Sequence, residues 1–187
     1  MSDETEVAPE GIECVVTYLE MRASPKLPPL QPPRGKKLAL MRAEPPTVSF
    51  YRYLYDAVGR DWRWTLRKRL SDATLRTIIE DPAVELYVLH VGGVPAGFSE
   101  LDHRLTPEIE LAYFGLAPQF IGHGLGAYFL NWTVRCAWEH TPSRLWVHTC
   151  TLDHPRALGL YQRVGFVVYD REAAIADADP DPAPPRD

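Results

Sequence analysis

The chain has 187 residues and a mass of 21.2 kDa, of which 45% are hydrophobic and 24% charged. This length is enough for one domain with a substantial core. The net charge of −5 and the pI near 5.7 argue against nucleic acid as the main partner. The sequence has no long apolar run and no signal-peptide pattern, so we expect a cytoplasmic protein that does not enter a membrane.

The cysteines are few and scattered, at Cys14, Cys136 and Cys150. Their number is odd and their spacing is not that of a metal site or a disulfide framework. We therefore expect buried thiols in a reducing compartment and no metal.

The N-terminal third combines strands, a proline-rich loop and helices. Residues 1–11 are polar and acidic, which predicts a disordered start, and 12–21 is a first strand. Five prolines make 24–35 an extended loop, and 38–41 returns as a short strand. Thr47 or Ser49 can cap a helix over 50–58, and Ser71 can cap a second over 73–80.

Tryptophans and cations alternate between those two helices, over 60–69. Three interpretations are open: a solvated basic helix with inward tryptophans, a wall of a substrate site, or a nucleic-acid patch. The acidic total disfavours the third.

The second half of the chain alternates strands and helices. Gly92-Gly93 joins strands 83–91 and 94–101 in a hairpin. A strand ending at Leu116, a helix over 125–139, a strand over 145–149, a helix capped by Asp153 and running to about 164, and a strand over 166–169 follow. The residues from 171 to 187 predict a disordered acidic tail, leaving 12–170 as a single domain. This order indicates an α+β fold around a mixed, mostly antiparallel sheet.

A glycine-rich turn lies between the strand ending at Leu116 and the long helix, in the sequence Gln-Phe-Ile-Gly-His-Gly-Leu-Gly of 119–126. Glycines let the backbone approach a ligand, and a helix start favours negative charge, so this turn predicts a phosphate site. A Walker loop would need a following Gly-Lys-Ser/Thr, and the dinucleotide fingerprint a G-x-G-x-x-G in an early βαβ unit. Neither is present.

Gln119-x-x-Gly122-x-Gly124 resembles the pyrophosphate-binding motif Q/R-x-x-G-x-G/A of the GNAT superfamily, the acyl-CoA-dependent N-acyltransferases. The segment 157–166 is similar to that family's A-x-x-L/F-Y-x-x-x-G-F segment, and the likeness covers roughly 84–169. One departure is His154, where many members carry asparagine. The resemblance implies a central sheet with helices on both faces, acetyl-CoA as cosubstrate, and transfer to a primary amine.

The resemblance also implies site residues. Cofactor contacts would fall to one strand residue and to the turn, namely Leu116, Gln119, Ile121, Gly122, His123, Gly124, Leu125 and Gly126. Tyr161 matches the general acid that protonates the leaving thiolate. Glu108 matches a family base by its offset, and Glu110, two residues on, shares its strand face. His148 and His154 are second-choice bases.

The acceptor is open between a small-molecule amine and a peptide amine. We hypothesise that Trp62, Arg63, Trp64 and Arg67 line its side, favouring an acceptor with a carboxylate or aromatic group. A homodimer is possible. Two alternatives remain: a non-catalytic acyl-CoA-binding or sensing module, and a nucleotide-phosphate enzyme.

Overall fold

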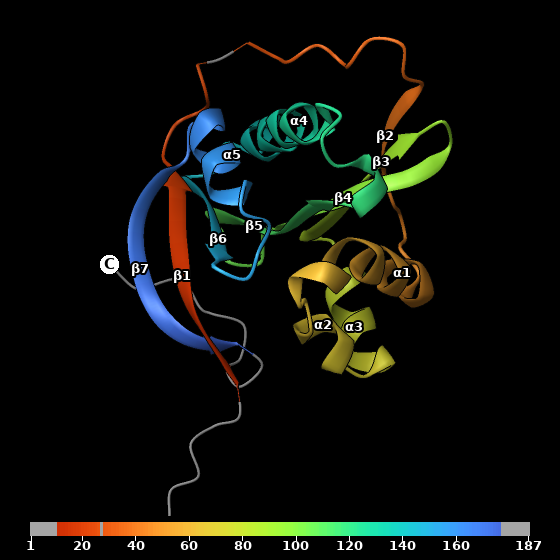
Figure 1. The fold of residues 1–187 in the computed structure, drawn as a ribbon. Coiled ribbons are helices and arrows are strands. Elements are labelled where there is room, and N and C mark those ends of the chain that lie inside the picture. The colour runs from red at the N-terminus through yellow and green to blue at the C-terminus, as the bar shows by residue number, and fades with distance from the viewer. Residues whose placement is uncertain (1–10, 27, 177–187) are drawn as a thin grey trace, which may run out of the picture.

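A seven-stranded sheet forms the centre of the molecule, seen in a computed structural model that describes residues 11–26 and 28–176 (Figure 1). Its strand order is β2-β3-β4-β5-β6-β1-β7. The strands are β1 (Ile12–Met21), β2 (Leu38–Arg42), β3 (Val84–Val91), β4 (Val94–Asp102), β5 (Glu108–Leu116), β6 (Arg144–Cys150) and β7 (Val167–Ala176). The pairing is antiparallel throughout except between β5 and β6, which confirms the predicted mixed sheet.

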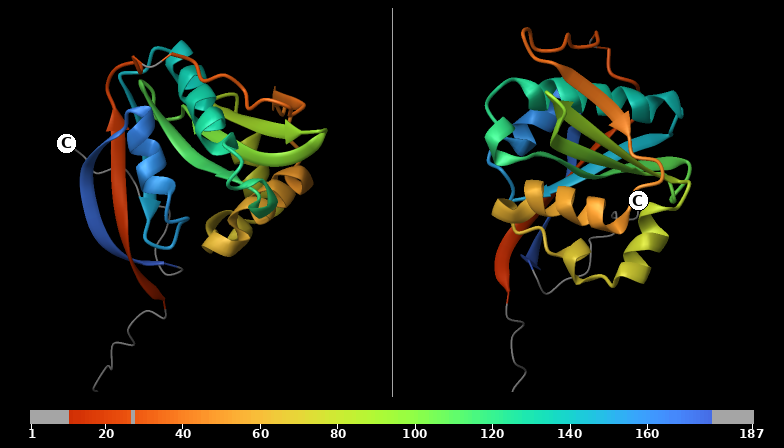
Figure 2. Two further views of the ribbon diagram at one scale, coloured as in Figure 1. Left: turned by 45° about the horizontal axis from the view of Figure 1, so that its top comes forward. Right: turned by 90° about the vertical axis from the view of Figure 1, so that its right-hand side faces the viewer.

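Helices cover both faces of the sheet. On one face lie α1 (Val48–Gly59), α2 (Leu66–Arg69) and α3 (Asp72–Ile79), and on the other α4 (Leu125–Glu139) and α5 (Ala157–Val164) (Figures 1 and 2). Short 3₁₀ turns precede α2 at Arg60–Trp62 and α4 at Pro118–Phe120. The first face is packed by aromatic residues around Tyr51, Tyr55 and Phe98, the second by aliphatic residues around Leu111, Leu130 and Val147.

Local sequence explains where the elements begin and turn. The side chains of Thr47 and Ser71 accept hydrogen bonds from the backbone N–H three residues on, as N-caps do. Gly92 and Gly93 both have positive φ, +60° and +89°, which the tight β3–β4 turn requires.

Two expectations at the C-terminal end are wrong. Asp153 does not cap α5, which begins at Ala157 after Arg156 with no side-chain cap; the Asp153 carboxylate instead accepts hydrogen bonds from Thr149 Oγ1 at 2.7 Å and from the Cys150 N–H at 3.0 Å. Residues 171–176, assigned to the tail, continue β7, because they pair with β1 from Ile12 to Thr17. The remainder of that tail and the start at 1–10 lie outside the described residues.

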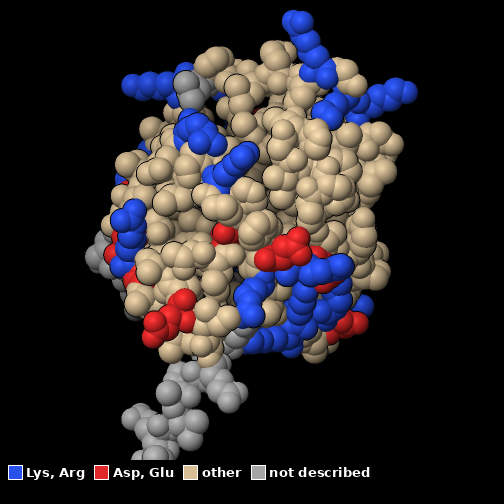
Figure 3. All heavy atoms as spheres, in the orientation of Figure 1, with Lys and Arg blue, Asp and Glu red and all other residues tan. Residues whose placement is uncertain are grey.

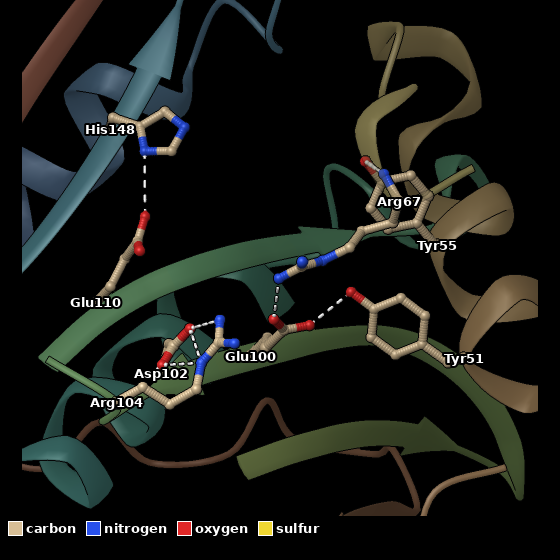
Figure 4. A network of polar contacts seen from close by, with 8 residues as sticks. All are labelled: Tyr51, Tyr55, Arg67, Glu100, Asp102, Arg104, Glu110 and His148. Carbon is tan, nitrogen blue, oxygen red and sulfur yellow. Dashed lines mark hydrogen bonds and ion pairs between the residues drawn. The ribbon is translucent and has the colours of Figure 1, made fainter. Parts of the chain in front are cut away.

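A buried ion pair joins α2 to the sheet. The Glu100 carboxylate is fully buried and accepts hydrogen bonds from Arg67 Nη2 at 2.8 Å and from Tyr51 Oη at 2.5 Å (Figure 4). The Arg67 guanidinium also lies 5.2 Å from the Tyr113 ring centre. This network fixes the α1–α2 face against β4 and β5.

Three basic residues of α1, α2 and the turn between them are paired with acids. Lys68 and Arg60 both contact Asp56, and Arg52 lies 2.7 Å from Asp72. Lys and Arg side chains gather over this region with carboxylates beside them (Figure 3). Within the described part of the chain, no helix is long and apolar enough to span a membrane.

Candidate active site

The sheet splits between β5 and β6, and the split creates a cavity. The two strands pair only from Glu108 to Glu110 against Arg144 to Trp146. Beyond that point they separate, and the residues that follow in each strand line a cavity of about 780 Å³. The glycine-rich turn, α5, β7 and the α1–α2 segment complete its wall. The cavity therefore lies beside the end of β5 and the glycine-rich turn that leads into α4.

The turn has the conformation that its glycines predict. Gly122 and Gly124 have φ of +85° and +76°, and a Cβ at either would meet nothing within 4 Å. They are glycines because of backbone conformation, and the space beside them is open. Gly124 is the N-cap of α4 and has no side chain that could accept a hydrogen bond. The backbone N–H groups in the first turn of α4 therefore have no capping side chain. Such a helix start can receive an anion.

The predicted cofactor residues divide into two groups. Leu116, Ile121, Gly122, Gly124 and Gly126 line the cavity, whereas Gln119, His123 and Leu125 are not among its lining residues. The Leu125 side chain packs in the core, 1% exposed. The Ile121 N–H is already bonded to the Pro118 carbonyl at 3.2 Å, so the anion-binding N–H groups would begin at Gly122.

Two arginines add positive charge on the α5 side of the cavity. Arg156 and Arg163 belong to its lining, and both residues are exposed. Together with the uncapped start of α4, they give this end of the cavity the charge that a phosphate-rich ligand needs. The residues present therefore fit the pyrophosphate of an acyl-CoA.

Tyr161 lies in the cavity wall and is 6% exposed. Burial, and then the charge of Asp153, raise the pKa of its phenol well above the usual 10.0. The phenol therefore keeps its proton at neutral pH, as a proton donor must.

The two glutamates on β5 have different surroundings. Glu108 Oε2 accepts a hydrogen bond from Arg144 Nη2 at 2.7 Å, where β5 and β6 are still paired. Glu110 Oε1 lies 3.4 Å from Nδ1 of His148, whose ring lines the cavity (Figure 4). Neither carboxylate lines the cavity itself. Glu110 reaches it through His148, and Glu108 is engaged by Arg144.

Of the four residues predicted for the acceptor side, three line the cavity and Arg67 does not. Trp62, Arg63 and Trp64 line the cavity opposite β6 and α5. The Trp62 ring lies 4.9 Å from the His154 ring, between centroids. Arg67 is 7% exposed and paired with Glu100, so assigning it to the acceptor wall was wrong.

Asp153 is a site residue whose role the sequence did not reveal. It lines the cavity, and its carboxylate also accepts a hydrogen bond from the Trp64 indole N–H at 3.3 Å. It thereby joins the end of β6 to the α1–α2 segment. Its position shortly before Pro155 predicts a helix cap. The contact with the Trp64 indole could not be predicted, because Trp64 is 89 residues away along the chain.

Comparison with known proteins agrees with this geometry. A family model, "Acetyltransferase (GNAT) family", matches residues 51–166. No curated protein matches the chain.

Solved structures share the fold. A GCN5-related N-acetyltransferase from Sphaerobacter thermophilus superposes with a TM-score of 0.59 at 17% identity, covering 87% of this chain and 50% of that one. An IAA acetyltransferase from Bacillus cereus gives 0.53 at 21% identity, covering 72% and 79%. A conserved protein of unknown function from Staphylococcus epidermidis gives 0.54 at 16% identity, covering 88% and 61%. The chain thus spans only half to two thirds of the length of two of these three proteins.

Proposed function

Because the chain belongs to the GNAT acetyltransferase family, we propose that it transfers an acetyl group from acetyl-CoA directly to a primary amine. The observation that carries this proposal is the meeting of three features at one cavity. The open glycine turn, the protonated Tyr161 and the His148–Glu110 pair all belong to, or directly adjoin, its wall.

Cofactor binding falls to the start of α4. Backbone N–H groups from Gly122 onward would hold the pyrophosphate, with Arg156 and Arg163 beside it. When bound there, acetyl-CoA supplies the acetyl group as a thioester. The backbone of Leu116, at the end of β5, would contact the pantetheine arm; the support for this is that Leu116 lines the cavity next to the turn.

Proton removal from the amine is assigned to the His148–Glu110 pair. Glu110 Oε1, 3.4 Å from Nδ1 of His148, would stabilise the imidazolium that forms when Nε2 of His148 takes the proton. Glu108 has a weaker case, because its carboxylate already neutralises Arg144. Tyr161 holds the proton that the departing thiol requires.

The acceptor would lie against the α1–α2 segment. Two indoles and one cation there favour an amine that also carries an aromatic group or a carboxylate. Whether that amine belongs to a small molecule or a peptide is decided by assay, with panels of both.

The test is release of CoA thiol from acetyl-CoA in the presence of primary amines. Tyr161→Phe and Glu110→Gln should each lower kcat by about a hundredfold or more while acetyl-CoA still binds. Glu108→Gln is the matched control on the same strand and should retain most activity. Acetyl-CoA binding without turnover for any amine would instead favour a non-catalytic acyl-CoA-binding module.

A further inference from the structure

Three metal-ligand side chains converge at the end of the sheet remote from the glycine turn. Glu85 lies on β3, His103 directly follows β4, and His140 is the C-cap residue of α4. Nε2 of each histidine lies 3.4 Å from the same carboxylate oxygen, Oε2 of Glu85. One ligand atom from each residue fits within 4.8 Å of the other two, and the imidazole rings are 4.4 Å apart between centroids.

These separations suit a metal better than they suit hydrogen bonds. Zinc bound to nitrogen and oxygen at about 2.0–2.1 Å has tetrahedral ligand–ligand edges of roughly 3.3–3.4 Å. The two nitrogen–oxygen separations match that edge and are longer than an ordinary N–H···O hydrogen bond. Nε2 of His103 is also shielded from solvent without a hydrogen-bond partner. A small cation between the three atoms would satisfy all of them.

The contacts around Glu85 hold its carboxylate with Oε2 toward the two histidines. Arg42 Nη1 lies 3.1 Å from Oε1, on the side away from the histidines, and the Tyr87 hydroxyl donates to Oε2 at 3.0 Å. These contacts orient the carboxylate, as outer contacts do for metal ligands.

The position of His140 leaves room for entry and for a fourth ligand. Its side chain is 45% exposed, whereas that of Glu85 is 7% exposed, so the cluster opens to solvent on the His140 side. None of the three residues lines the catalytic cavity. The two ends of α4 are about 22 Å apart, so this cluster is separate from the site at the helix start.

We propose that Glu85, His103 and His140 form a zinc site, with water as the fourth ligand. The ion joins β3, the segment after β4 and the end of α4, and so fastens that helix to the sheet. Cys136, one helical turn before His140, is not part of the cluster. The proposal does not depend on the proposed acetyl transfer.

The experiment uses the full chain purified without a histidine tag and stripped with a chelator. Titration with Zn²⁺ by calorimetry should show one ion per chain and a midpoint of thermal unfolding raised by several degrees. Co²⁺ should give the intense visible absorption of a four-coordinate ion, without a thiolate charge-transfer band.

Variants separate the proposed ligands from their neighbours. His140→Ala, at an exposed position that should not affect folding, and His103→Ala should each weaken Zn²⁺ binding by about tenfold or more. His90→Ala removes another imidazole of β3 itself and should leave Zn²⁺ binding unchanged, as should Cys136→Ser. Absence of stoichiometric binding, binding that both ligand variants retain, or a thiolate band with Co²⁺ would overturn the proposal.

Discussion

The buried Arg67–Glu100 pair gives a sharp test of how the α1–α2 segment is held beside the active site. Glu100 is fully buried, and its two carboxylate oxygens accept hydrogen bonds from Arg67 and Tyr51. Replacing Arg67 by Met leaves the carboxylate with the Tyr51 hydroxyl alone. Removing one partner of a buried ion pair costs about 3–5 kcal/mol. For a domain of this size, that lowers the unfolding midpoint by roughly 6–20 °C.

The double variant isolates the cause. Adding Glu100→Gln to Arg67→Met removes the unpaired charge, so much of the lost free energy of unfolding should return. Urea unfolding followed by tryptophan fluorescence measures the single variant, the double variant and a control. Arg69→Met is the matched control, an exposed arginine of the same helix, and should change the free energy by less than about 0.5 kcal/mol.

The reasoning would be refuted by either of two results. One is a cost below about 1 kcal/mol for Arg67→Met, since a fully buried carboxylate cannot lose its cation so cheaply. The other is a double variant no more stable than the single one. If Arg67→Met raised the KM for the acceptor and left stability unchanged, Arg67 would contact the acceptor instead of stabilising the fold.

Three further predictions concern the turn, the acid and a helix cap. Gly124→Ala puts a side chain at φ +76°, which should cost about 1–2 kcal/mol of stability and weaken acetyl-CoA binding about tenfold in calorimetry; unchanged affinity would contradict the assigned role of the turn. Because the pKa of Tyr161 is raised above 10.0, the phenol loses its proton only above that pH, so kcat should not fall between neutrality and about pH 9; an alkaline loss in that range that Tyr161→Phe abolishes would oppose the assignment. Ser71→Ala removes the hydrogen bond to Thr74 N–H and should cost about 1 kcal/mol by urea unfolding; no change would mean that this cap does not stabilise α3.

The sequence predicts the fold well because the signals are local. The Gly92-Gly93 hairpin, the cap at Ser71 and the spacing of apolar residues in 125–139 each report on neighbours along the chain. The glycine turn is likewise a local motif, and its positive φ angles follow from residue type. These signals locate the elements and one end of the site.

Features that depend on distant contacts could not be predicted in this way. The composition of residues 171–176 predicts a disordered tail. They form a strand because they pair with β1. Arg67 resembles its exposed neighbours in sequence and differs by meeting Glu100. The preference for Glu110 over Glu108 depends on His148 and Arg144, both from β6.

The proposed zinc site shows the same limit. Its three residues are 18 and 37 positions apart along the chain and come from separate elements, so no ligand spacing marks them. The expectation that the chain binds no metal rested on cysteine spacing alone, which says nothing of a histidine–glutamate cluster.

The most direct test of the central claim is thermal melting of the purified protein with acetyl-CoA, with ATP and NAD as controls. A ligand at 100 times its Kd adds about 2.7 kcal/mol, which shifts the midpoint by several degrees at this size. The account predicts a shift with acetyl-CoA that the two nucleotides do not produce and that Gly124→Ala diminishes. A shift with ATP or NAD and none with acetyl-CoA would contradict it.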